Sequence, residues 1–142
     1  MRTITLTGNP MSTQNLYINS GGRRFKNKKA QDRKLQYQWE AKSQWKGEPL
    51  TGDICINVLL YFGTKRRSDF DNFLKIALDS LENICYNDDS QITEAHVFKL
   101  YSKENPRIEI SVLTENMCTT CGRIFDTNRG MSQHIRKEHD EE

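Results

Sequence analysis

The sequence predicts a small α/β (α+β) domain with helices packed on a small mixed sheet, followed by a C-terminal zinc-finger-like module. Three observations predict it: β-branched runs alternate with helical patterns, the chain has 142 residues, and Cys and His recur at fixed spacing near the end. This length suits one ordinary domain plus a small addition. We therefore expect a core over residues 1–114 and a second module over residues 115–142.

The first half of the core is expected to hold a strand, a helix and a second strand. Residues 3–6 alternate as a short strand does, and the Ser-, Asn- and Gly-rich stretch 12–22 is typical of a loop. Residues 26–45 contain no Gly or Pro and predict a helix with a basic outer face. The β-branched and aromatic run 54–62 lies between glycines and predicts a buried strand.

The second half completes the expected order β-α-β-α-β-β. Apolar residues recur at helical spacing over residues 70–81, and Ser68 with Asp71 resembles a capping box at the start of that helix. Residues 91–101 and 107–113 predict two strands, which we expect to pair as a hairpin. Helices packed against one small mixed sheet follow from this order.

Charge is unevenly distributed although the net charge is only +2. Residues 23–46 carry nine Lys or Arg against two acids, whereas residues 69–94 carry seven acids against Lys75. A polyanion that binds the basic segments would be repelled by the acidic centre unless cations lay there, as in a metal-dependent nuclease. The alternative is two solvated surfaces of opposite sign.

Targeting and membrane segments are not evident in the sequence. No apolar run approaches the roughly 18 residues that a membrane span needs, and the N-terminus lacks the apolar segment of a secretory signal. We expect a cytoplasmic, DNA-associated protein with no membrane partner.

The acidic centre offers candidate ligands for a divalent cation. Asp69 and Asp71 lie where a helix is expected to begin, and Asp89 precedes a β-branched run, so three carboxylates are available to Mg²⁺. Lys75 follows Asp71 by one helical turn and would neutralise charge on a phosphate in the transition state. Each has a structural alternative: acids near helix starts stabilise by about 0.3–1 kcal/mol, and Lys75 suits an ordinary ion pair.

These residues occur in an order that resembles the RusA family of Holliday junction resolvases. The shared pattern consists of Arg67, Asp69, Asp71, Asn72 and Lys75, followed by Asp88, Asp89, Gln91 and Ile92, with Lys99 as a further basic residue and Gly8, Pro10 and Asn15 near the N-terminus. The resemblance implies a small nuclease that forms a homodimer and binds one or two Mg²⁺ ions through Asp69, Asp71 and Asp89. The stretch from Asp71 to Asp89 is one residue shorter than in the family prototype, which leaves Asp88 as a rival to Asp89.

The resemblance and the charge pattern together indicate a function. We expect Mg²⁺-dependent nicking of four-way DNA junctions at symmetric positions, with Lys75 at the catalytic site. DNA-binding residues are expected to be Arg66, Arg67, Lys99, Arg23 and Arg24. Two alternatives stay open: a non-catalytic zinc-finger DNA-binding or regulatory protein, and a nuclease of the same fold that cuts flaps or forks.

The last residues carry the spacing of a two-Cys, two-His zinc finger. Twelve residues separate a Cys-x-x-Cys pair from two histidines, which have four residues between them, and two apolar residues occupy the positions of a small finger core. The expected ligands of one structural Zn²⁺ are Cys118, Cys121, His134 and His139, with Phe125 and Met131 as the apolar pair and a helix from about Asn128. Whether such a finger contacts DNA or protein stays open.

Overall fold

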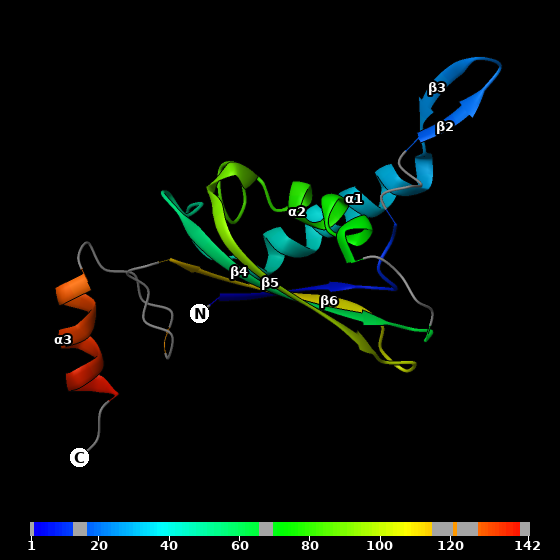
Figure 1. Cartoon of the computed structure of the whole chain (residues 1–142). Helices are drawn as coiled ribbons and strands as arrows, with labels where there is room; N and C mark the ends of the chain where they lie inside the picture. The colour runs from blue at the N-terminus through cyan, green and yellow to red at the C-terminus, as the bar shows by residue number, and fades with distance from the viewer. Residues whose placement is uncertain (1, 13–16, 66–69, 115–120, 122–127, 140–142) are drawn as a thin grey trace.

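The protein is a mixed α and β structure, as expected (Figure 1). The computed structural model describes residues 2–12, 17–65, 70–114, 121 and 128–139, of which residues 17–20, 24–26, 70, 71 and 128 are described by their backbone alone. One four-stranded sheet has the order β1-β6-β4-β5. Its strands are β1 (Arg2–Thr7), β4 (Ile54–Phe62), β5 (Ile92–Tyr101) and β6 (Arg107–Thr114).

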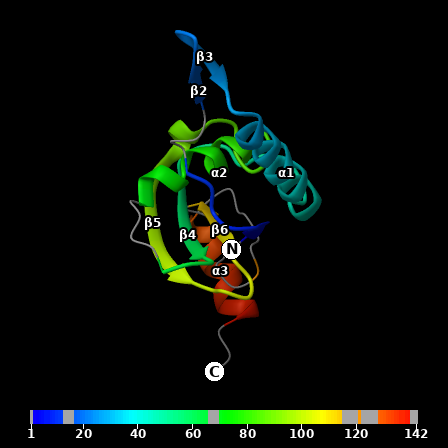
Figure 2. The same cartoon turned by 90° about the vertical axis from the view of Figure 1, so that its right-hand side faces the viewer.

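Two helices cover one face of this sheet (Figures 1 and 2). Helix α1 (Lys28–Gln44) begins at Asn27, whose side chain accepts a hydrogen bond from the Lys29 amide at 2.9 Å. Helix α2 (Lys75–Ser80) lies between β4 and β5 in the chain and packs against α1. No helix in the described part of the chain is long and apolar enough to cross a membrane.

The expected pairing of the last two strands is wrong. β5 pairs in parallel with β4, and β6 pairs antiparallel with β4 on its other side, so that β4 lies between them. β6 places Ile108, Ile110 and Val112 on the buried face, which suits an interior strand, whereas β5 is largely exposed and suits an edge. The turn between them therefore passes the end of β4, where the Ser102 amide donates to the Phe62 carbonyl at 2.9 Å.

The expected loop 12–22 is also partly wrong, because it contains half of a hairpin. Strands β2 (Tyr17–Ser20) and β3 (Arg23–Lys26) pair antiparallel through Gly21-Gly22, whose φ angles are 58° and 76°. Two successive residues of positive φ form the tight turn that suits the twist of a two-residue hairpin, and glycine adopts it without steric cost. The hairpin projects from the body of the molecule in both views (Figures 1 and 2).

The second predicted helix is divided into two short segments. A 3₁₀ turn, η2 (Phe70–Phe73), leads into α2, which starts at Lys75 rather than near Ser68. The expected capping box includes Ser68, which lies outside the described residues.

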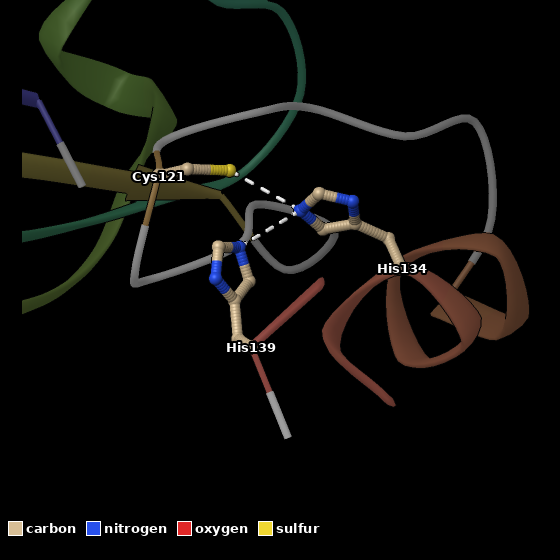
Figure 3. Close-up of side chains that lie close together, drawn as sticks. All are labelled: Cys121, His134 and His139. Carbon is tan, nitrogen blue, oxygen red and sulfur yellow. Dashed lines mark hydrogen bonds between the residues drawn. The ribbon is translucent and has the colours of Figure 1, made fainter. Parts of the chain in front are cut away.

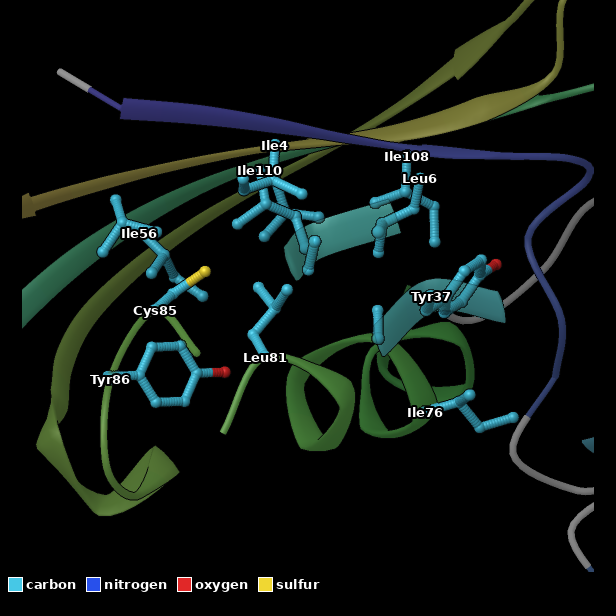
Figure 4. Packing of buried hydrophobic residues seen from close by; sticks show 14 of the residues in the cluster. Ile4, Leu6, Tyr37, Ile56, Ile76, Leu81, Cys85, Tyr86, Ile108 and Ile110 are labelled. Carbon is cyan, nitrogen blue, oxygen red and sulfur yellow. The ribbon is translucent and has the colours of Figure 1, made fainter. Parts of the chain in front are cut away.

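The core lies between the sheet and the two helices (Figure 4). Ile4, Ile56 and Ile110 project from three adjacent strands toward Leu81 and Tyr86, and all five side chains are at most 1% exposed. Burying one such aliphatic side chain stabilises the fold by about 1.5–3 kcal/mol. This core fixes the ends of α2 and β5, which carry the candidate site.

Helix α1 also covers the free edge of β1. The Gln44 side chain accepts from the Thr5 amide and donates to the Thr5 carbonyl, both at 2.7 Å, and Glu40 accepts from the Thr7 amide at 3.0 Å. Side chains thus satisfy backbone groups that an edge strand leaves open. The opposite edge strand, β5, leads to the candidate site.

Candidate active site and candidate C-terminal metal centre

A short 3₁₀ turn, η3 (Asp89–Gln91), positions the acidic pair that precedes β5. The Asp88 carboxylate accepts from the Ser90 amide at 3.2 Å, and the Gln91 side chain accepts in turn from the Asp88 amide at 2.9 Å. The side-chain Nε2 of Gln91 also donates to the carbonyls of Leu50 and Gly52, each at 2.9 Å. Asp88 and Gln91 therefore hold this turn in place.

Asp89 belongs to a different set of contacts, which we call the acidic cluster: Asp79, Glu82 and Asp89. Oxygen atoms of these three carboxylates all lie within 4.8 Å of one another. Lys75 lies beside the cluster, with its Nζ 3.4 Å from Asp79 Oδ2. This i,i+4 ion pair is made with Asp79, a member of the cluster, whereas the ion pair considered from the sequence was with Asp71, whose side chain is not among those described.

Neighbouring groups shift the pKa values of Asp88 and Asp89 in opposite directions. A hydrogen bond with the Asp88 carboxyl raises the pKa of Asp89, and partial burial and repulsion by Asp88 and Asp79 raise it further, while Lys75 opposes them. Hydrogen bonding by Ser90 lowers the pKa of Asp88. The Asp88 carboxylate therefore stays charged and accepts the capping hydrogen bond, whereas Asp89 is the member of the pair that lies among the carboxylates of the acidic cluster.

The donor set of the acidic cluster fits a hard divalent cation. Carboxylate oxygens are the protein ligands that Mg²⁺ prefers, and a cation would relieve the repulsion among three closely spaced acids. Asp79 and Glu82 were not among the expected site residues. A signal was present, because Lys75, Asp79 and Glu82 are spaced by four and three residues, which places them on one side of a helix.

The other expected site residues lie partly outside the described residues. Arg66, Arg67 and Asp69 lie outside the described residues, and Asp71 is described only by its backbone in η2. Lys99 is exposed near the end of β5, ten positions beyond Asp89 in the sequence. In the β2–β3 hairpin, Arg23 is exposed and Arg24 is described by its backbone alone.

A second cluster of potential ligands lies at the C-terminal helix α3 (Asn128–Glu138), which begins where expected (Figure 3). Nε2 of His134 lies 3.2 Å from Cys121 Sγ and 3.1 Å from His139 Nε2. His139 follows the helix directly, and its amide still donates to the Ile135 carbonyl at 2.9 Å. One thiol and two imidazoles therefore converge on one point, which is a donor set that suits Zn²⁺. The fourth expected ligand, Cys118, and the apolar Phe125 lie outside the described residues.

Comparison with known proteins decides the family. Residues 7–113 match the family model for endodeoxyribonuclease RusA. The chain belongs to the RusA family of endodeoxyribonucleases. It is 29% identical over 105 residues to the crossover junction endodeoxyribonuclease RusA of Aquifex aeolicus, which covers 72% of this chain and 83% of that protein. It is also 41% identical over 46 residues, about a third of each protein, to the uncharacterised YqaN of Bacillus subtilis.

The acidic cluster lies inside the residues that match the RusA family, and the C-terminal cluster lies outside them. Residues 7–113 include the acidic cluster, the η3 turn and Lys75, so these belong to the endodeoxyribonuclease region. The match ends before Cys121 and α3, so the C-terminal cluster lies beyond the matched region.

Proposed function

We propose that the protein resolves four-way DNA junctions by Mg²⁺-dependent nicks at symmetric positions on two strands. The observation that carries the proposal is the acidic cluster with Lys75 beside it in a RusA-family chain. The relative from Aquifex aeolicus, whose name describes a crossover junction nuclease, supports junctions as the substrate. Branched DNA is the partner, and we place the enzyme with cellular DNA.

In this proposal Asp69, Asp71 and Asp89 hold one or two Mg²⁺ ions, with Asp79 and Glu82 close enough to Asp89 to share in binding. When bound, Mg²⁺ lowers the pKa of a water molecule and neutralises the scissile phosphate. Lys75 reaches from the start of α2 to stabilise negative charge on the phosphate, and its ion pair with Asp79 restricts its position. Asp88 keeps the η3 turn formed, so that Asp89 stays directed at the cluster.

We propose that basic residues of the chain hold the DNA. Arg66, Arg67 and Lys99 are proposed to contact backbone phosphates close to the cut, and Arg23 and Arg24 to contact them from the projecting hairpin (Figure 1). Arg33 is not included, because its Nη1 donates to the Asn9 carbonyl at 2.6 Å and to the Tyr37 hydroxyl at 3.2 Å. Such phosphate contacts make binding strongly dependent on salt.

Symmetric cutting requires two active sites. A closed homodimer with a two-fold axis provides one site for each of the two cut strands. Sedimentation on and off the junction tests this, and a monomer in both conditions would contradict it.

The C-terminal residues are proposed to form a zinc finger with Cys118, Cys121, His134 and His139 as ligands. The convergence of Cys121, His134 and His139 supports this assignment. We propose that the folded finger adds affinity or selectivity for the junction, since it follows the nuclease region and α3 carries Arg129, Arg136 and Lys137.

The deciding experiment uses the purified full-length protein with a synthetic four-way junction, a flap, a fork and plain duplex, each with and without Mg²⁺. We expect paired, ligatable nicks in the junction only, and only with Mg²⁺. Preferred cutting of the flap or fork would favour the other nuclease function. Binding without cleavage of any substrate would favour a regulatory DNA-binding protein.

A further inference from the structure

A third group of potential metal ligands lies on the sheet face opposite α1 and α2. It consists of Cys55 on β4 and Glu94 and His96 on β5, and we call it the sheet-face cluster. One ligand atom from each residue, the thiol sulfur, a carboxylate oxygen and a ring nitrogen, lies within 4.8 Å of the other two. His96 Nε2 is 2.7 Å from Glu94 Oε1.

The cluster depends on a local irregularity in the pairing of β4 with β5. Ile54 pairs with Ile92, but the next residue, Cys55, pairs with Glu94, so Thr93 is the extra residue of a bulge. In regular pairing Cys55 would be matched with Thr93, and Glu94 would be displaced by one position along β4. A bulge re-aims side chains in this way. His96 then follows Glu94 by two residues and lies on the same face.

We propose that Cys55, Glu94 and His96 bind a Zn²⁺ ion on this face of the sheet. A thiolate, an imidazole and a carboxylate are the three protein ligand types of zinc, and three ligands leave one coordination position for water. The all-oxygen acidic cluster has a different preference, for a hard cation such as Mg²⁺. Nothing in the nuclease proposal uses the sheet-face cluster.

A simple ion pair between His96 and Glu94 explains less of the arrangement. Their side chains are 50% and 63% exposed, and an ion pair at that exposure contributes little to stability. An ion pair between His96 and Glu94 also does not account for the position of the Cys55 thiol beside them.

A zinc ion in this cluster would link the central strand to the exposed edge strand. β5 begins at Ile92, directly after the η3 turn that holds Asp89, and its ladder with β4 is interrupted at the bulge. Because its ligands come from both strands, the zinc ion would connect β4 to β5 where their hydrogen-bond ladder is interrupted. Zinc is therefore expected to raise the unfolding temperature of the core without being required for cleavage.

The test is zinc content of the full-length protein after removal of metal, reloading with Zn²⁺ alone and gel filtration. The wild type and the Cys55→Ser and His96→Gln variants are compared, with Cys85→Ala as a matched control because Cys85 is a buried core thiol. We expect Cys55→Ser and His96→Gln each to lose one equivalent of zinc relative to the wild type, and Cys85→Ala to lose none.

Because each variant is compared with the wild type, the difference in zinc content tests the proposal whether or not the C-terminal finger binds zinc. A Cys118→Ser, Cys121→Ser variant is measured in parallel and should lose a separate equivalent, so that adding Cys55→Ser leaves none. Loading with Co²⁺ adds a spectroscopic readout, since a thiolate–cobalt absorption band in the Cys118→Ser, Cys121→Ser variant must disappear when Cys55→Ser is added. Unchanged zinc content in folded Cys55→Ser and His96→Gln would overturn the proposal.

Discussion

Replacing Asp88 and Asp89 separately by Asn tests the division of roles between two adjacent carboxylates. Asp88 caps the η3 turn, and Asn caps as well as Asp does, so Asp88→Asn should leave both folding and cleavage near the wild-type level. Asp89 lies in the acidic cluster, so Asp89→Asn removes a proposed cation ligand. We expect cleavage to fall by on the order of 10²–10³-fold, which is typical when one electrostatic element of a transition-state site is lost.

Junction binding should respond in the opposite direction. Unit charges about 4 Å apart in water interact by roughly 1 kcal/mol, so removing the Asp89 charge should tighten metal-free binding by up to about fivefold. Cleavage is measured with a labelled four-way junction in Mg²⁺, and binding by gel shift in chelator. The reasoning would be refuted if Asp88→Asn abolished cleavage while Asp89→Asn cut at nearly the normal rate.

Three further predictions concern pH, the C-terminal residues and the core. Because the pKa of Asp89 is raised, its carboxyl takes up a proton at higher pH than an ordinary Asp. As the pH is lowered, cleavage should therefore begin to decline at a pH above the range in which an ordinary Asp titrates. Asp88→Asn should lower the midpoint pH of this decline, and an unchanged midpoint would contradict the effect of Asp88 on the pKa of Asp89. Truncation after Thr114 should leave a folded, Mg²⁺-dependent nuclease with weaker junction binding, since the described core cluster includes no residue of α3; unfolding in circular dichroism would disprove this. Tyr86→Phe should cost about 0.5–1.5 kcal/mol in urea unfolding, because its hydroxyl donates to the Leu78 carbonyl at 2.6 Å, and an unchanged free energy of unfolding would show that this bond adds no stability.

Local patterns in the sequence predicted the elements well. The strand over residues 54–62 is β4, and the helix over residues 26–45 corresponds to α1, which begins two residues later because Lys26 ends β3. Periodicity and terminal residues are local properties, so the sequence shows them. The β2–β3 hairpin was missed, although Gly21-Gly22 is itself a hairpin signal. Residue type does not decide which side chains of this segment are buried, since Trp45 is 7% exposed and Trp39 is 73% exposed.

Pairing and clustering depended on tertiary contacts. The sequence could not show that β4 separates β5 from β6, because strand order follows from which faces must be buried together rather than from the length of a turn. The separation of Asp88 from Asp89 likewise depends on hydrogen bonds to Ser90 and Gln91 and on the approach of α2.

The sequence by itself determined the α and β composition, the nuclease family resemblance, the ligand spacing of the C-terminal residues and the acidic segment, because each is set by residue type and by short-range spacing. Only the tertiary structure brought Asp79 and Glu82 to Asp89, and Cys55 to Glu94 and His96. Those groups lie on separate elements or across a bulge, and their distances are fixed by the packing of α2 and β5 on β4. Residue type sets which chemistry a side chain can perform, whereas the tertiary structure sets which side chains lie beside it.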